Sequence, residues 1–181
     1  MKNILVFLLL FLSFVNGYSQ GTCATANYIG SIPFSATGLT TCGQGNNYSS
    51  NDACNSNYLN GDDYVFEYTP TINQTLDITV SNHAGWTGWF VTQGCPDVGS
   101  CIASETGSGT GALNNLASLS AGVTYYIVVS TYPTPQCTSF DISIDEVVVG
   151  EDDCSDAVQM NDGQIYNSSN QLATADLCLG S

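Results

Sequence analysis

Apolar and polar residues alternate with a period of two along several short stretches of this 181-residue chain. The alternation is clearest over residues 64–68, 75–81 and 140–145, where every second side chain is aliphatic or aromatic. This spacing is typical of β-strands that bury one face and expose the other. Residues 123–130 form a denser apolar run, which predicts a central strand buried on both faces.

The rest of the pattern favours an all-β protein. Further short strands are expected near residues 28–34, 86–92 and 113–119, and clusters of Gly, Pro, Asn and Asp separate the strands. Helix-forming Glu, Lys and Arg are scarce, whereas Thr and Tyr, which favour strands, are common. Seven to nine short strands with such turns predict an antiparallel, jelly-roll-like β-sandwich.

The first twenty residues have the pattern of an export signal. Lys2 supplies a positive charge, an unbroken apolar run covers residues 4–12, and small and polar residues follow from Gly17 to Gln20. An apolar run of this length is too short to span a bilayer, so a secretory signal peptide is favoured over a membrane anchor. We expect cleavage after Gln20 and a mature chain that is extracellular or held at the cell surface.

The charge of the chain excludes several classes of function. It carries 16 Asp and Glu residues but only one Lys or Arg, Lys2. Without cationic side chains, the mature chain cannot neutralise phosphates, so nucleic-acid binding is excluded, as are a Schiff-base lysine and an arginine clamp. His83 is the only histidine, no G-x-S-x-G segment occurs, and most carboxylates occupy polar loops or outward strand positions. We therefore expect no catalytic residues and no enzyme activity.

Eight cysteines in an exported chain predict a disulfide framework. Their number is even, and the paired C-x-x-C knuckles of a zinc site do not occur. The shortest spacing, from Cys95 to Cys101, favours a bridge that closes one short loop. The eight are Cys23, Cys42, Cys54, Cys95, Cys101, Cys137, Cys154 and Cys178.

The beginning of the mature chain recurs near its end. Cys-Ala-Thr-Ala from Cys23 matches Cys-Ser-Asp-Ala from Cys154, 131 residues later. We expect a β-sandwich module over residues 21–149, then residues 150–181 as a linker and the truncated start of a second such module, a neighbouring repeat. A chance match of two short segments is the alternative. With the repeat, the expected disulfides are Cys95–Cys101, Cys23–Cys42, Cys154–Cys178 and Cys54–Cys137.

Two stretches give the chain a resemblance to a known group of modules. The first is YSSNDAC, ending at Cys54, with NGDDYVFEYTP at residues 60–70; the second is AGVTYYIVVS at residues 121–130 with PQC at residues 135–137. Together they resemble the extracellular β-sandwich repeats of Bacteroidetes surface and secreted proteins, which are similar to bacterial pre-peptidase C-terminal domains. The resemblance implies a non-catalytic accessory module, often repeated, in large proteins exported by type IX secretion.

Aromatic side chains provide the candidate ligand site. Trp86, Trp89 and Tyr132, together with Tyr48 and Tyr58, are candidates for a platform on which sugar rings stack. The alternative is that at least one tryptophan fills the core, because Trp86 and Trp89 would point to opposite faces of a regular strand. We expect a binding, adhesion or structural module with an extracellular glycan or protein partner. The alternative is an accessory domain, pre-peptidase-type or carbohydrate-binding, of a larger secreted hydrolase.

Oxygen-rich loops provide the candidate metal site. Carboxylates without neighbouring cations repel one another, and a bound divalent ion would relieve that repulsion. Calcium, which takes about 6–8 oxygen ligands, is the expected cofactor if there is one. Its candidate ligands are Asp52, Asp62, Asp63 and Asn60. The alternative is that these acids keep an exported surface soluble and that Asn-Gly-Asp is an ordinary turn.

Overall fold

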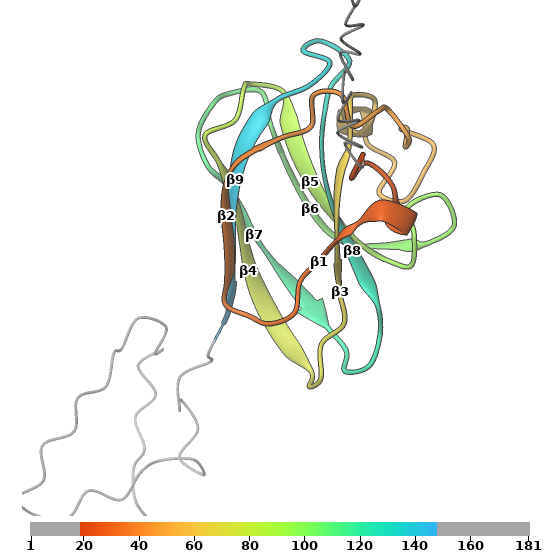
Figure 1. Ribbon diagram of the computed structural model, residues 1–181, viewed down its shortest axis with the longest axis vertical. Coiled ribbons are helices and arrows are strands. Elements are labelled where there is room, and N and C mark those ends of the chain that lie inside the picture. The colour runs from red at the N-terminus through yellow and green to blue at the C-terminus, as the bar shows by residue number, and fades with distance from the viewer. Residues whose placement is uncertain (1–18, 148–181) are drawn as a thin grey trace, which may run out of the picture.

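The structure is a computed structural model that describes residues 19–147, and these residues form two packed β-sheets (Figure 1). One sheet has five strands in the order β1-β3-β8-β5-β6, and the other has four in the order β2-β9-β4-β7. Paired strands are antiparallel except β1 and β3, which are parallel. The predicted β-sandwich is therefore confirmed, with one parallel pair at an edge. The strands are β1 (Asn27–Tyr28), β2 (Phe34–Thr40), β3 (Tyr64–Tyr68), β4 (Gln74–Ser81), β5 (Thr87–Gln93), β6 (Ser100–Gly107), β7 (Leu113–Leu119), β8 (Tyr125–Thr131) and β9 (Ser139–Glu146).

The inner faces of the two sheets enclose the main hydrophobic core. β4 contributes its alternate residues Leu76, Ile78 and Val80, all fully buried, as the period of two predicts. β8 lies between β3 and β5, and both Ile127 and Val128 on it are fully buried although they point to opposite faces. The prediction of a central strand buried on both faces is confirmed.

A second, smaller core lies on the outer face of the five-stranded sheet. Val65, Phe90 and Val128 project from β3, β5 and β8 on this side and are fully buried. Residues 41–63, which connect β2 to β3 and which we call the cap, cover these side chains with Tyr48 and Leu59. Because the cap excludes water from this apolar face, it makes a third layer of the molecule.

Two strands differ from the sequence-based expectation. The sequence does not predict β6, because Ser-Cys-Ile-Ala-Ser-Glu-Thr-Gly has no apolar alternation. β6 is an edge strand whose side chains are exposed or half-buried, so its pairing with β5 rather than burial defines it. The strand expected over residues 28–34 is divided into β1 and β2, with Pro33, which lacks an N–H donor, between them.

Three disulfides join described residues, and their pairing differs from the expected one. They are Cys23–Cys95, Cys42–Cys137 and Cys54–Cys101. The expected bridges Cys95–Cys101, Cys23–Cys42 and Cys54–Cys137 are therefore wrong, and Cys154–Cys178 lies outside the described residues.

The turn between β5 and β6 is closed by hydrogen bonds and not by a disulfide. The backbone N–H groups of Val98 and Gly99 donate to the carbonyl oxygen of Cys95 at 3.0 and 2.6 Å, so hydrogen bonds already close this turn. Cys95 instead bonds to the short 3-10 turn η1 (Cys23–Thr25), and Cys101 bonds to the cap. Spacing along the chain is therefore a poor guide to disulfide pairing, because the bridges join segments that are far apart in the sequence.

Two segments expected from the sequence lie at the ends of the chain. Residues 150–181, expected to begin a second module, lie outside the described residues, as do residues 1–18 of the expected signal peptide. Within residues 19–147, no helix combines the length and the hydropathy that crossing a membrane requires.

Candidate ligand-binding site

Three aromatic rings meet on the surface at one end of the sandwich. Tyr58 and Trp86 are stacked, with ring centroids 6.1 Å apart and planes inclined by 21°. Tyr132 closes the triangle, 5.5 Å from Trp86 and 5.8 Å from Tyr58. We call these three residues the aromatic cluster. All three are candidates from the sequence for a surface on which sugar rings stack, and the fold brings them together.

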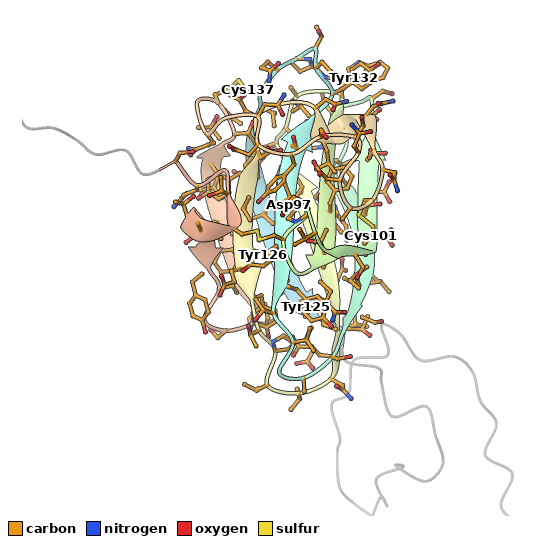
Figure 2. All side chains as sticks on the ribbon, turned by 90° about the vertical axis from the view of Figure 1, so that its right-hand side faces the viewer. Asp97, Cys101, Tyr125, Tyr126, Tyr132 and Cys137 are labelled. Carbon is orange, nitrogen blue, oxygen red and sulfur yellow. A yellow bond between two sulfur atoms is a disulfide. The ribbon has the colours of Figure 1, made fainter. Side chains whose placement is uncertain are left out.

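The ends of two paired strands position two of the rings. Trp86 directly precedes β5 and Tyr132 directly follows β8, which are neighbours in the sheet. The Tyr132 N–H donates to the carbonyl oxygen of Trp86 at 2.9 Å, so the two backbones are joined at this point. Figure 2 shows Tyr132 at one end of the sandwich, with Tyr125, at the start of β8, toward the other end.

The cap positions the third ring. Tyr58 lies in the 3-10 turn η2 (Asn57–Leu59), whose start is capped by the Ser56 hydroxyl accepting the Tyr58 N–H at 3.2 Å. Leu59, the next residue, is fully buried in the smaller core and anchors the turn. Tyr58 therefore reaches the cluster from a segment far from Trp86 in the sequence.

Trp86 combines high exposure with an unusual backbone conformation. Its side chain is 45% exposed and that of Tyr132 is 37% exposed. Its φ angle is +65°, in the left-handed region that bulky residues rarely adopt. An exposed aromatic ring buries little surface in return for that backbone cost, and such strained residues concentrate at functional sites. This combination marks Trp86 as the centre of the candidate site.

Two of the aromatic residues proposed from the sequence are interior residues instead. Trp89 is fully buried in the main core, where its Nε1–H donates to the Leu113 carbonyl at 3.1 Å. Tyr48 is buried in the smaller core, and its hydroxyl accepts the Cys23 N–H at 3.1 Å. The expectation that Trp89 contacts ligand is therefore corrected: Trp89 lies within β5 and points inward, whereas Trp86 precedes the strand.

Asp63 is a fully buried carboxylate beneath the cap. Its Oδ2 accepts the backbone N–H groups of Asn47 at 2.6 Å and Tyr48 at 2.9 Å. Its Oδ1 is buried with no hydrogen-bond partner among the described residues. Burial raises the pKa of Asp63 to about 7, although the N–H donors oppose this by favouring the ionised form. Asp63 thus fastens the cap to the sheet from inside.

The other three candidate metal ligands also hold the cap. Side-chain oxygens of Asp62, Asp52 and Asn60 accept backbone N–H groups within the cap at 2.9, 2.6 and 3.0 Å. No group of three or more His, Cys, Asp or Glu side chains gathers as metal ligands within residues 19–147. The four oxygen-bearing residues therefore have structural roles, and calcium binding at them stays a prediction.

His83 has a structural environment. Its ring is almost fully buried, with Nδ1 2.6 Å from the Ala84 carbonyl oxygen and Nε2 2.8 Å from the Gly111 carbonyl oxygen. The imidazole therefore links the loop after β4 to the loop after β6. Both ring nitrogens are occupied by backbone groups, so neither faces a nucleophile or a carboxylate.

A hollow lies at the opposite end of the sandwich from the aromatic cluster. It has a volume of about 330 Å³ and lies where β4 begins and β9 ends. Among the described residues that line it, Glu146 is the only titratable one and none is aromatic. The aromatic cluster is thus the better candidate for ligand recognition.

Comparison with known proteins finds similarity to solved structures. No protein-family profile matches it, and no curated protein matches it either. It is similar to the pre-peptidase C-terminal domain of a collagenase from Bacillus anthracis, at 17% identity and a TM-score of 0.46, covering 66% of this chain and 94% of that one.

Two further solved structures show weaker similarity. PliG of Aeromonas hydrophila, a periplasmic inhibitor of g-type lysozyme, is 12% identical with a TM-score of 0.45, covering 67% of this chain and 95% of that one. The GH26-CBM35 β-(1,4)-mannanase of Podospora anserina is 12% identical with a TM-score of 0.33, covering 49% and 20%. Scores and identities at this level assign no function to the chain.

Proposed function

We propose that this protein is an exported, non-catalytic module that binds an extracellular ligand through the aromatic cluster. The observation that carries the proposal is the exposure of Trp86 and Tyr132 on a fixed backbone, with Trp86 held at a φ of +65°. Exposed aromatic rings provide a large contact area at low cost in side-chain entropy, which is why binding surfaces are enriched in them.

The disulfides and the composition support an extracellular setting. Three disulfides within residues 19–147 are typical of proteins that fold in oxidising compartments. The near absence of Lys and Arg makes a role with phosphate-bearing partners unfavourable. The proposal includes the origin that the resemblance implies, a surface or secreted Bacteroidetes protein with neighbouring repeats. It also includes attachment to a larger protein, as an adhesive repeat or as the accessory domain of a secreted hydrolase.

Binding of the disulfide-bonded chain to arrays of immobilised extracellular polysaccharides and proteins tests the proposal. We expect retention on at least one surface, lost in Trp86→Ala and kept in Tyr28→Ala. Tyr28 is 65% exposed on β1, far from the cluster, and so provides a matched aromatic control. Retention that Trp86→Ala leaves unchanged, or no retention on any surface, would contradict the proposed site.

A separate assay tests the non-catalytic part of the proposal. We expect no turnover of a panel of peptides, esters and glycans by the purified chain, because the single histidine contacts only backbone carbonyls through its ring nitrogens. Turnover abolished by His83→Ala, or by replacement of one carboxylate, would show that the chain is an enzyme.

A further inference from the structure

We infer that the ligand of the aromatic cluster is an uncharged polysaccharide, one of whose pyranose rings stacks on the exposed part of the Trp86 ring, with Tyr132 beside it. This inference rests on the proposed function and adds the chemical class of the ligand. It follows from the separation of the rings, from the charge of the surrounding loops, and from the hydrogen-bonding groups that those loops offer.

The separation of the rings excludes a ligand that inserts between them. The three centroid distances are 5.5, 5.8 and 6.1 Å. A methylene, a proline ring or an ammonium group between two ring faces needs about 7–8 Å, twice the usual contact distance. The cluster is therefore neither a cage nor a slot. Because the rings of Trp86 and Tyr132 are inclined by 49°, they do not form one flat surface, and the ligand must stack on the exposed part of a single ring.

This geometry disfavours two alternative ligands. An aromatic cage for a quaternary ammonium ion surrounds the cation with ring faces, and the rings here are already in contact with one another. Recognition of a proline-rich peptide uses grooves between aromatic side chains, which the same contacts close. A pyranose ring has flat, apolar C–H faces, and one such face matches the face of a single exposed aromatic ring.

The charge of the surrounding loops indicates that the ligand is neutral. The chain has a net charge of −15, yet residues 82–86, 108–112 and 132–138 contain no Asp, Glu, Lys or Arg. The cap, which carries Tyr58, does contain acids, but Asp52 and Asp62 there accept backbone N–H groups of the cap itself. A cationic ligand would be expected to meet carboxylates here, and an anionic ligand would be repelled by the rest of the molecule. A neutral ligand is compatible with both observations.

Neutral hydrogen-bonding groups lie beside the aromatic cluster. Asn57 directly precedes Tyr58 in η2, and Gln136 follows Tyr132 in the loop after β8, with its Nε2 donating to Asp62 at 3.3 Å. Amide groups both donate and accept hydrogen bonds, which suits the hydroxyl groups of a sugar. Because a single aromatic ring covers one face of the ligand only, binding should be weak, with Kd on the order of 0.1–1 mM.

The two tryptophans make the experiment direct. Trp86 is 45% exposed and Trp89 is fully buried, so a neutral quencher such as acrylamide acts mainly on Trp86. The full disulfide-bonded chain is titrated with hexasaccharides of neutral β-1,4-glucan and β-1,4-mannan, with an anionic galacturonate hexasaccharide, and with a proline-rich decapeptide. We expect at least one neutral hexasaccharide to shield Trp86 from acrylamide, and the anionic sugar and the peptide to leave quenching unchanged.

Variants test whether the sugar binds at the aromatic cluster. Tyr132→Ala should weaken binding of the neutral sugar about tenfold, as seen in the fluorescence titration, and Tyr28→Ala should leave it unchanged. Trp86→Ala should abolish binding measured by calorimetry, with circular dichroism confirming that the variant is folded. Trp86→Phe, which keeps a ring face, should bind more tightly than Trp86→Ala, since ring stacking and not only the backbone at this position holds the sugar.

The possible failures are distinguishable. Shielding by the peptide or the anionic sugar, without shielding by any neutral sugar, overturns the inference and leaves the proposed binding function standing. Sugar binding that both Trp86→Ala and Tyr132→Ala retain overturns the site. No shielding by any probe overturns the inference, and together with an array on which nothing is retained it overturns the proposed function as well.

Discussion

A single buried carboxylate at the base of β3 fixes how the cap sits on the sheet. Asp63 receives N–H groups from two consecutive cap residues, Asn47 and Tyr48, and its own N–H donates to the Gly45 carbonyl at 2.9 Å. Within the described residues, no cationic side chain balances its charge, because the only Lys or Arg of the sequence is Lys2. Ionisation of the Asp63 carboxyl is therefore unfavourable in the folded protein. The free energy of unfolding should consequently depend on pH.

Stability should fall as pH rises from about 4 to about 7. The pKa of Asp63 is raised by burial from 3.8 to about 7. A folded-state pKa above the unfolded value means that the contribution is fully present below pH 3.8 and lost as pH rises through about 7. The full shift corresponds to about 4 kcal/mol. Urea unfolding at several pH values should show this slope, and Asp63→Asn should flatten it.

The matched control for this experiment is an exposed carboxylate. Asp145→Asn makes the same side-chain exchange on the exposed part of β9, so it reports the effect of removing a carboxylate that is not buried. A pH slope in Asp63→Asn equal to that in Asp145→Asn would contradict a specific role of the buried carboxyl.

Gly61, two residues before Asp63, has no room for a side chain. A Cβ on Gly61 would collide with the Thr131 hydroxyl and would lie 2.7 Å from the Gln136 carbonyl oxygen. Gly61→Ala should therefore destabilise the fold by about 1–3 kcal/mol, the usual cost of overpacking. Thermal unfolding measures the loss. Gly109→Ala, where a Cβ meets nothing within 4 Å, should stay close to the wild type, and equal losses in both variants would contradict the packing argument.

At the scale of the elements, the cap determines the candidate site as much as the strands do. It carries Tyr58 to Trp86, and Cys54 ties it to Cys101 on β6. The cap has neither strand nor α-helix, so hydrogen bonds to side chains, the smaller core and disulfides hold it in place. Its arrangement consequently depends on contacts between residues far apart in the sequence.

Removal of one bridge should loosen the cap while the sandwich remains folded. Cys54 and Cys101 are 47 residues apart, and closing a loop of that size contributes about 4 kcal/mol in the chain-entropy model. The double variant Cys54→Ala/Cys101→Ala should lose about 2–4 kcal/mol in urea unfolding and should expose Trp86 further to acrylamide. Non-reducing peptide mapping of the wild type should join Cys54 to Cys101. A peptide that joins Cys95 to Cys101 would contradict the bridges described here.

The sequence predicts those strands that a local pattern of apolar and polar residues defines. The alternation in β4 and β9 and the dense run of β8 follow from which faces are buried, and the sequence carries that information directly. The edge strand β6 and the cap leave no such periodic signal. The sequence predicts a disulfide framework but not its pairing, since the bridges join segments that the fold alone brings together.

The candidate site is predictable in part. Chemistry singles out Trp86, Tyr132 and Tyr58 as exposed aromatic candidates, but it does not separate them from Trp89, three positions after Trp86. The separation comes from where β5 begins, at residue 87, which places one tryptophan before the strand and the other inside it. Strand boundaries are the detail that hydrophobic periodicity determines least well.

For the whole molecule, uncompensated negative charge is the dominant electrostatic feature. A net charge of −15 opposes compaction, and dissolved salt screens that repulsion. We expect the melting temperature to rise with sodium chloride, and to rise further with millimolar calcium at equal ionic strength. Asp62→Asn should reduce the calcium-specific part by mass action. Identical melting curves in chelator and in calcium would leave the carboxylates as solubilising charge only.

The described chain enters and leaves the sandwich at opposite ends, which has a mechanical consequence. The Gln20 carbonyl accepts the Val65 N–H at the start of β3, whereas the Val147 N–H donates to Thr75 near the start of β4. Tension between these points would run from Gln20 to Cys42, both along the chain and through the bridges Cys23–Cys95 and Cys54–Cys101, then cross to Cys137 and continue to Val147. Between Cys42 and Cys137, which are 95 positions apart, only residues 43–54 and 95–101 lie on either route. A stretched module would therefore lengthen mainly by its two terminal segments, and the three residues of the aromatic cluster would bear no direct pull.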